Sequence, residues 1–285
     1  MALGLFHFQL MYDILQELHF IYDEEKLAAY VVDKLSAALN AEAGTVFRLE
    51  ENGDFYPLAA FGTSVEKLRS VQFKSGKGVV GWVIQYMQPV KVENPANDPR
   101  FFGGVDVFTG FKTRSIIATP IVSKNKPRGV LEFLNRKDRP FALQDLEMIS
   151  VLGREIGIAF ENIHLIKELQ ERRAFQDAVT NSLSAGLLIV DQAGNLLEAN
   201  PQAREILNLG ELKVKQPVSS VLKSCPSFEA VIELITKAEQ PIRRQAITLE
   251  INGAEKRIGY SGVPILSQDG ARLGSAILFQ DITNL

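Results

Sequence analysis

The stretch FALQDLEMISVLGREIGIAFENIHLIKELQERRAFQDA, residues 141–178, divides the chain into two parts. Its apolar residues repeat in steps of four and three, as in a coiled-coil seam: Leu152, Ile156, Ala159, Ile163 and Ile166. At about 1.5 Å per residue the helix is roughly 57 Å long, more than one small domain needs. We predict that a helix over residues 145–180 connects two domains and pairs two chains. The alternative is a helix packed only on its own domain, because Gly153 and Gly157 weaken its first turns.

The composition is that of a soluble globular protein. Of 285 residues, 46% are hydrophobic and 23% are charged, which excludes disorder as the main state. At roughly 100 to 200 residues per domain, the length predicts two domains. The net charge of -3 gives no attraction to nucleic acid or to an anionic membrane surface. We therefore expect neither as a partner.

Few residues are available for redox or metal chemistry. Cys225 is the only cysteine, so no disulfide within the chain and no cysteine-rich zinc site can form. The three histidines, His7, His19 and His164, fall on predicted helices, which disfavours a metal or haem centre. No apolar run is long enough to span a membrane, and no secretion signal is recognisable. We expect a cytoplasmic protein without a metal site.

On the N-terminal side of the long helix, the pattern changes from helical to strand-like. Residues 3–40 carry two helical stripes, the first beginning at Leu3, with Asp23 as the break or cap between them. From Thr45 onward, about five short strands alternate with turns and with helices at residues 78–87 and within 94–112. This is the pattern of an α+β domain.

On the C-terminal side, a second set of about five strands follows Ser182. Asn200 and Pro201 predict the start of a short helix after the second strand. The fold class predicted for the whole chain is α+β. Each of the two domains has a central antiparallel sheet of about five to six strands flanked by helices, and a long coiled-coil helix joins them.

No pattern in the sequence indicates catalysis. The chain has no G-x-x-x-x-G-K-[ST], no G-x-S-x-G and no H-E-x-x-H motif. The glycines of GKGVVG at residues 76–81 lack the preceding hydrophobic strand of a dinucleotide site. We predict no catalytic residue, and read the chain as two small sheet-based pockets linked by helices, the layout of a sensor.

The first region resembles the GAF domain. The resemblance is carried by GKGVVGWVIQYMQPVKVENPANDPRF at 76–101, GVDVFTGFKTRSIIATPI at 104–121 and GVLEFLNRKDRPFALQDLEMI at 129–149. It implies a GAF domain with an N-terminal dimerisation helix over residues 1–165, similar to the cyclic-nucleotide-binding domains of phosphodiesterases and bacterial adenylate cyclases. Their Asn-Lys, Phe and Asp-Glu signature is matched in position by Asn135, Arg136, Phe141 and Asp145. Arg136 replaces the lysine and still permits an ion pair with Asp145, whereas Leu146 replaces the final glutamate.

The same resemblance implies a ligand site for cAMP or cGMP. It places apolar walls, two hydroxyls and two carboxylates around the ligand, at Thr45, Phe61, Val79, Val80, Phe102, Asp106, Thr109, Thr113 and Glu132. In this interpretation Thr109 and Thr113 hydrogen-bond the ligand, and Asp106 and Glu132 orient it or its lid. A bilin has no cysteine to attach to in this region. The alternative is a GAF domain with an empty or small pocket that serves only as a dimerisation scaffold.

The second region, residues 172–285, resembles the PAS domain. The resemblance is carried by NSLSAGLLIVDQAGNLLEANPQAREIL at 181–207 and GYSGVPILSQDGARLGSAILFQDIT at 259–283. Asp281, Ile282 and Thr283 match the junction at which such domains pass a signal to a following helix. The reactive cysteine of the flavin variant and the histidine of the haem variant are missing, so no cofactor is expected. Cys225 is interpreted as structural or incidental.

Together the two resemblances imply a sensory module of a signal-transduction protein. It would bind a small ligand, cAMP or cGMP, in the GAF domain and work as a homodimer. The signal would pass through the helices and the PAS domain to a covalently following effector, a nucleotide cyclase or a histidine kinase. We expect no enzyme activity from this chain itself.

Overall fold

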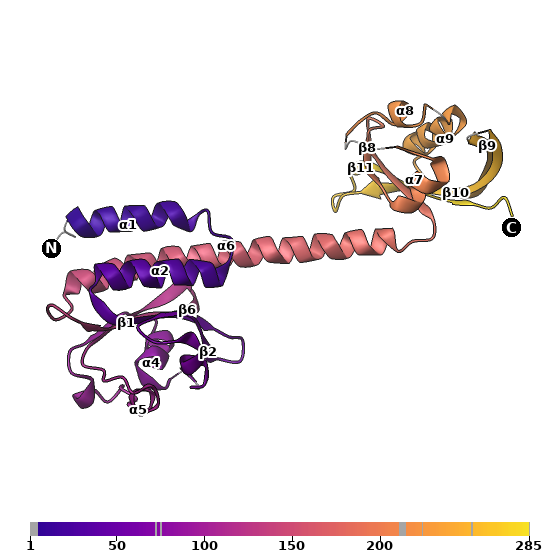
Figure 1. The fold of residues 1–285 in the computed structure, drawn as a ribbon. Helices are drawn as coiled ribbons and strands as arrows, with labels where there is room; N and C mark the ends of the chain where they lie inside the picture. Colours follow the sequence, from indigo (N-terminus) through magenta and orange to yellow (C-terminus); the bar gives the residue numbers. More distant parts are fainter. Residues whose placement is uncertain are drawn as a thin grey trace. The chain divides into compact units, whose positions relative to one another are not determined.

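The computed structural model describes residues 5–71, 73–74, 76–210, 215–223, 225–251 and 253–284. They form two compact units, Met1–Leu169 and Gln170–Leu285 (Figure 1). Leu3 of the first predicted stripe lies outside the described residues. No helix among the described residues is long and apolar enough to cross a membrane.

The first unit is built on an antiparallel sheet with the strand order β3-β2-β1-β6-β5-β4. Its strands are β1 (Ala41–Leu49), β2 (Asp54–Phe61), β3 (Phe73–Lys74), β4 (Val90–Val92), β5 (Ile116–Ser123) and β6 (Lys126–Arg136). Its helices are α1 (Leu5–Leu18), α2 (Glu24–Ala38), α3 (Val65–Arg69), α4 (Gly78–Tyr86), η1 (Pro95–Asn97), α5 (Gly104–Thr109) and the long α6 (Leu143–Asn181). Helices α1, α2 and α6 share one hydrophobic cluster with one face of the sheet, and α4 packs on the other.

The second unit has an antiparallel sheet with the order β8-β7-β11-β10-β9. Its elements are β7 (Gly186–Asp191), β8 (Leu196–Ala199), α7 (Pro201–Leu207), α8 (Val218–Val221), α9 (Pro226–Lys237), β9 (Ile242–Ile251), β10 (Ala254–Leu266) and β11 (Arg272–Asp281). One hydrophobic cluster joins its three helices to the sheet, with Phe228 and Phe279 in edge-to-face contact at 4.9 Å. The prediction of two antiparallel sheets flanked by helices, with a long helix between the two regions, is confirmed.

Two helix starts are set by the side chains expected from the sequence. Asp23 is the N-cap of α2, where its carboxylate accepts a hydrogen bond of 2.8 Å from the Lys26 backbone N–H. Asn200 caps α7 in the same way through the Ala203 N–H, with Pro201 in the first turn. Asn200 also accepts from the Leu187 N–H at 2.8 Å, so the cap ties α7 to β7.

β1 begins at Ala41, four residues before the strand expected from Thr45. The sequence AEAG has no strand propensity of its own, and packing decides its conformation. A Cβ atom at Gly44 would lie 2.6 Å from the ring of Phe133, so this residue lets the β6 aromatic ring cross β1 closely. Local propensity is overridden here by the tertiary structure.

The first part of α6 lies directly on β5, backbone against backbone. A Cβ atom at Gly157 would lie 2.2 Å from the carbonyl oxygen of Val122, and one at Gly153 would lie 2.7 Å from that of Pro120. Side chains at these two positions would push the helix off the strand. The glycines that weaken the helix locally are therefore what allows it to pack this closely.

This packing corrects the seam predicted for pairing two chains. Leu152, Ile156 and Ala159 are buried in the domain's own core, and Ile163 packs against the same cluster. Only Ile166 of the five predicted seam residues is exposed, at 40%. The four-and-three spacing of apolar residues arises from contact with the domain's own sheet and helices. Over this part of α6, the alternative of a helix packed on its own domain is therefore correct.

We expect Gly157→Ala to destabilise the first unit by at least about 2 kcal/mol, since overpacking typically costs about 1–3 kcal/mol and the clashing atom belongs to the backbone. Denaturant unfolding followed by the fluorescence of Trp82, the chain's single tryptophan, measures this unit. Gly103→Ala is the matched control, because its Cβ would meet Phe101 at an ordinary 3.5 Å. Equal stability of the two variants would contradict the close approach.

Candidate functional site

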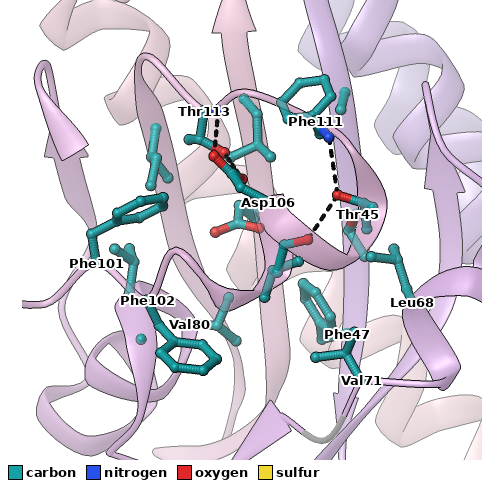
Figure 2. Close-up of a pocket in the computed structure, with 18 of the residues that line it drawn as sticks. Thr45, Phe47, Leu68, Val71, Val80, Phe101, Phe102, Asp106, Phe111 and Thr113 are labelled. Atoms are coloured by element: carbon teal, nitrogen blue, oxygen red, sulfur yellow. Dashed lines mark hydrogen bonds between the residues drawn. The ribbon is translucent and has the colours of Figure 1, made fainter. Parts of the chain in front are cut away.

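A cavity of about 90 Å³ lies between the sheet of the first unit and residues 101–113, which we call the covering segment (Figure 2). Strands β1 and β6 form its floor and the first turn of α4 forms one wall. The covering segment, which includes α5, closes it. Eight of the nine predicted site residues line this cavity: Thr45, Val79, Val80, Phe102, Asp106, Thr109, Thr113 and Glu132.

Phe61 is the predicted site residue that does not line the cavity. It packs on the opposite face of the sheet, against the cluster that includes α2 and α6. Thr45 pairs with Ala60, so the next residue along β2 points to the other face. The pairing of β1 with β2 shifts register between Val46 and Phe47, and a shift of one residue exchanges the faces of all later side chains.

Two polar residues stand side by side on the cavity floor. Thr45 of β1 is directly opposite Glu132 of β6, and Glu132 is in turn opposite Ala118 of β5. Around them the walls are apolar: Phe47, Val79 and Val80 all belong to one buried cluster. The floor therefore places the Glu132 carboxylate next to walls that are largely apolar.

Glu132 is an unusual carboxylate. Burial, and to a lesser degree the charge of Asp106, raises its pKa to about 7. Some surface of the side chain stays accessible because it faces the cavity, but the protein around the carboxylate is dense enough to disfavour its charged form. A carboxylate that titrates near neutral pH in a cavity marks a candidate binding site.

The covering segment is held closed by its own hydrogen bonds (Figure 2). Asp106 accepts from the Thr113 N–H at 2.7 Å and from the Thr113 hydroxyl at 2.6 Å. The Thr109 hydroxyl donates to the Val105 carbonyl at 2.8 Å and accepts from the Phe111 N–H at 3.3 Å. Both threonine hydroxyls thus already donate their hydrogen bonds within the protein. In this conformation they can only accept hydrogen bonds from a ligand.

Positive charge lines the side of the cavity near α4. Lys74 and Lys77 line the cavity, and the Lys77 amine lies 4.1 Å from the centre of the Phe102 ring. Lys77 is also the N-cap of α4, and its side chain makes no cap hydrogen bond to the first N–H groups of this helix. Such a helix start, with two lysines beside it, is suited to an anion.

Several lining residues were missed by the sequence analysis. The additional aromatic and basic ones are Phe47, Phe101, Phe111, Lys74 and Lys77. Phe47 could have been found from its place two residues after Thr45 on the same strand. The lysines could not, because nothing in a short polar run shows which side chains will face a cavity.

Both ends of the covering segment are anchored. Before it, Arg100 pairs with Asp98 through two hydrogen bonds of 2.8 and 2.6 Å and stacks over Trp82. After it, the Asn135 side chain accepts from the Arg114 N–H at 2.7 Å and donates to the Lys112 carbonyl at 2.8 Å. Movement of the segment is therefore restricted to the part between these anchors.

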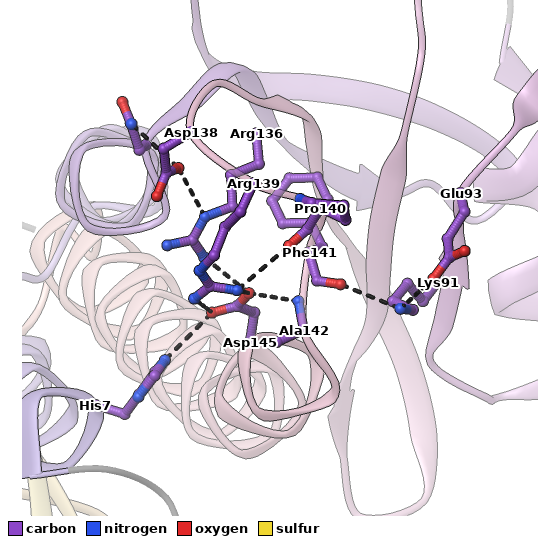
Figure 3. A network of polar contacts seen from close by, with 11 residues as sticks. His7, Lys91, Glu93, Arg136, Asp138, Arg139, Pro140, Phe141, Ala142 and Asp145 are labelled. Atoms are coloured by element: carbon purple, nitrogen blue, oxygen red, sulfur yellow. Dashed lines mark hydrogen bonds and ion pairs between the residues drawn. The ribbon is translucent and has the colours of Figure 1, made fainter.

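The signature residues next to Asn135 form a polar network at the start of α6 (Figure 3). Arg136 and Asp145 make the expected ion pair, at 2.8 Å, and Asp145 also accepts from the Ala142 N–H at 2.7 Å. Burial alone would raise the pKa of Asp145, but the hydrogen bonds from Ala142 and His7 and the charge of Arg136 hold it below its usual range. Arg139 adds a contact of 3.2 Å, and the His7 Nε2 atom lies 3.2 Å from the carboxylate.

These contacts make Asp145 a structural residue. It fixes the start of α6, holds α1 through His7 and joins both to the end of β6 through Arg136. Leu146, at the position where the family signature has glutamate, packs against the neighbouring hydrophobic cluster. The network lies apart from the cavity lining, so these residues support the fold around the site without entering it.

Comparison with known protein families agrees with this geometry. The family model of the GAF domain matches residues 23–160, and that of the PAS fold matches residues 180–285. The chain is a GAF domain followed by a PAS domain. It is therefore a sensory module, with the cavity in its GAF domain.

The relatives found among curated proteins include two cyclic-nucleotide phosphodiesterases. The probable 3',5'-cyclic phosphodiesterase pde-5 of Caenorhabditis elegans is 24% identical over 150 residues, 53% of this chain and 20% of that protein. The dual 3',5'-cyclic-AMP and -GMP phosphodiesterase 11A of Takifugu rubripes is 26% identical over 192 residues, 62% of this chain and 21% of that protein. The chain thus spans about a fifth of the length of these relatives.

Solved GAF domains share the fold of the first unit. The GAF domain of a phosphoenolpyruvate-protein phosphotransferase from Coxiella burnetii matches with a TM-score of 0.52 at 18% identity, covering 57% of this chain and 96% of that one. The corresponding domain from Acinetobacter matches with a TM-score of 0.51 at 19% identity, covering 58% and 99%. At these identities the similarity shows the fold alone.

In the PAS domain, Cys225 is buried and precedes α9 at the N-cap position. Asp281 of the predicted output junction accepts hydrogen bonds from the Thr283 N–H at 3.0 Å and hydroxyl at 2.6 Å. The Thr283 hydroxyl oxygen in turn accepts from the Arg257 N–H at 2.9 Å, so the junction is tied to β10. That this domain has no ligand stays a prediction.

We expect the stability of the GAF domain to fall as pH rises from about 5 to 8, and Glu132→Gln to remove this loss. The folded state keeps the Glu132 proton up to about pH 7, whereas the unfolded chain releases it near its model value of 4.5, so ionisation favours unfolding. At about 1.4 kcal/mol per unit, the effect is at most about 3 kcal/mol.

Denaturant unfolding of both proteins at the two pH values, followed by Trp82 fluorescence, measures it. Glu51→Gln, in the exposed turn between β1 and β2, is the matched control and should behave like the parent protein. A constant difference in stability between the parent and Glu132→Gln across this range would show that Glu132 titrates normally.

Proposed function

We propose that the GAF cavity binds a cyclic nucleotide, cAMP or cGMP, as a regulatory ligand. In this proposal the chain acts as a homodimer and relays occupancy of the cavity through α6 and the PAS domain. The receiver is an effector of the nucleotide cyclase or histidine kinase class in a longer protein. The similarity to cyclic-nucleotide phosphodiesterases supports the choice of ligand class.

The observation that carries the proposal is that the cavity lining combines basic groups with apolar surfaces. Lys74, Lys77 and the start of α4 offer hydrogen-bond donors and positive charge to a phosphate. Phe47, Phe102 and the valines of α4 offer flat and branched apolar surfaces to a purine. A phosphate joined to a purine matches both kinds of lining group at once.

Binding requires the covering segment to move. The cavity of about 90 Å³ is smaller than the roughly 300–1,000 Å³ of pockets that enclose drug-sized ligands. Lys77 and Phe102 hold the covering segment against α4, and both are side chains that can swing. A ligand that favours an opened or rearranged segment shifts the protein toward that conformation by its differential affinity.

Strand β5 offers a physical route from the cavity to α6. Ile116, at the start of β5, lines the cavity and follows the covering segment in the chain. Farther along the same strand, the carbonyls of Pro120 and Val122 touch α6 at Gly153 and Gly157. A shift of β5 therefore reaches the helix backbone without intervening side chains, and α6 continues to Asn181.

We expect cAMP or cGMP to bind, and Lys77→Met to weaken binding by about tenfold or more, since a hydrogen bond to a charged group contributes about 1.5–3 kcal/mol. Methionine keeps an unbranched apolar chain near Phe102 while removing the charge. Isothermal titration calorimetry of the full chain measures both affinities.

Lys67→Met, on the exposed side of α3, is the matched control and should bind like the parent. If neither nucleotide gives heat at about 100 μM, the ligand-free dimerisation scaffold becomes the better description.

The homodimer in this proposal uses a different face of α6 from the predicted seam. Val151, Ile158 and Leu165 are 40–46% exposed and lie seven residues apart, so they form a stripe on the helix. Asn162 lies at the position between two of them where coiled coils often place a single asparagine, which fixes register. The stripe is exposed enough to pair, and its Ile158 and Leu165 also line a groove beside α1.

We expect Ile158→Asp to convert a dimer of about twice 31.6 kDa into a monomer, because pairing would bury an unpaired charge. Size-exclusion chromatography with light scattering measures the mass. Lys167→Asp is the control, since nine residues along a helix of 3.6 residues per turn places it on the opposite side. A parent protein that is already monomeric would contradict the proposed dimer.

A further inference from the structure

Glu132 is the unexplained group of the cavity. It occupies the floor between Thr45 and Ala118, two residues that carry no charge. Within the described part of the chain, its carboxylate has no hydrogen-bond or ion-pair partner, although it is enclosed by protein. None of the described residues uses this carboxylate as a structural contact, and this points to a role in binding.

The charged groups that line the cavity around Glu132 are one acid and two bases. Asp106 faces it from α5, Lys74 from β3 and Lys77 from the start of α4. Strands β1 and β5 contribute only uncharged residues to the lining, and no histidine lines the cavity among the described residues. Of these groups, Asp106 is the one whose charge raises the pKa of Glu132 and so opposes its ionisation.

Asp106 has a different environment. Both of its carboxylate oxygens accept hydrogen bonds from Thr113, and these bonds close the covering segment. An anionic ligand in the cavity is therefore close to the carboxylate of Asp106. Whenever Glu132 is ionised, the ligand is also close to a second negative charge. Two carboxylates and a phosphate in one small cavity repel one another, and Glu132 is the group that can relieve the repulsion by taking up a proton.

We propose that Glu132 couples ligand binding to proton uptake, so that the GAF cavity binds its anionic ligand more tightly at lower pH. This inference rests on the proposed function, because it takes the ligand to be a cyclic nucleotide, whose phosphodiester carries one negative charge near neutral pH. When protonated, Glu132 adds no charge and can donate a hydrogen bond to the ligand. The cavity then responds to ligand and pH together.

Thermodynamic linkage gives the size of the effect. The pKa of Glu132 is about 7 without ligand, and a nearby anion raises it further. If the bound form titrates at least about one unit higher, affinity falls about fivefold to tenfold between pH 6 and pH 8. By reciprocity, the same ligand makes the protein take up between about 0.4 and 0.9 of a proton at pH 8, the fivefold and tenfold cases respectively.

The test is calorimetric titration of the full chain with cAMP and with cGMP at pH 6 and pH 8. Repeating the pH 8 titration in buffers of different ionisation enthalpy measures the protons taken up per ligand. We expect the parent to lose about fivefold to tenfold in affinity and to take up about 0.4 to 0.9 of a proton at pH 8. Glu132→Gln should bind with similar affinity at both pH values and take up almost none, whereas Glu51→Gln should behave like the parent.

The outcomes separate this inference from the proposed function. Binding by the parent with the same affinity at both pH values, or tighter binding at pH 8, overturns proton coupling and leaves the cyclic-nucleotide site in place. A pH dependence that persists in Glu132→Gln assigns the proton to another group and also overturns it. If no nucleotide binds at either pH to the folded parent, both proposals fail. The proton count on the parent still tests the coupling if the variant does not fold, because an uptake near zero at pH 8 overturns it.

Discussion

The contact between the backbones of α6 and β5 is the constraint on which the GAF domain depends. Gly153 and Gly157 bring the helix so close that the carbonyls of Pro120 and Val122 occupy the space where side chains would stand. In most helix-on-sheet packing a layer of side chains separates the two and can absorb small movements. Here that layer is missing at two turns of the helix, so strand and helix must move together or the contact must break.

This rigidity matters because β5 is shared by both faces of the sheet. One end of the strand follows the covering segment and lines the cavity with Ile116, while Ile117 and Ile121 pack in the helix-side cluster. Asn135 fixes the junction by binding the backbone of residues 112, 114 and 115. The cavity and the helix are thus two sides of one strand, and no distant pathway has to be invoked to connect them.

The sequence predicted the parts of this structure that depend on local chemistry or on position in a family pattern. The caps at Asp23 and Asn200 were readable because a side chain and a backbone N–H three residues away suffice to form them. Eight cavity residues followed from resemblance. Phe61 did not, since a register shift in the β1–β2 pairing decides which face it takes. The face of α6 that enters the core was also misjudged, because helical spacing shows an apolar stripe but not its partner.

Two acidic side chains of the GAF domain show how the same functional group takes opposite roles. Asp145 is buried with hydrogen bonds or ion pairs to Ala142, Arg136, Arg139 and His7, and these partners hold its pKa low. It stays charged and holds the start of α6 in place. Glu132 is enclosed without such partners among the residues that the structure describes, and its pKa is raised instead. A buried charge with partners helps to hold the fold together. A buried charge without partners has a cost in folding free energy, which an apolar residue at the same position would remove. Because that cost lies on the floor of the cavity, directly beneath the covering segment, we interpret it as the property that lets this site change its charge when a ligand arrives.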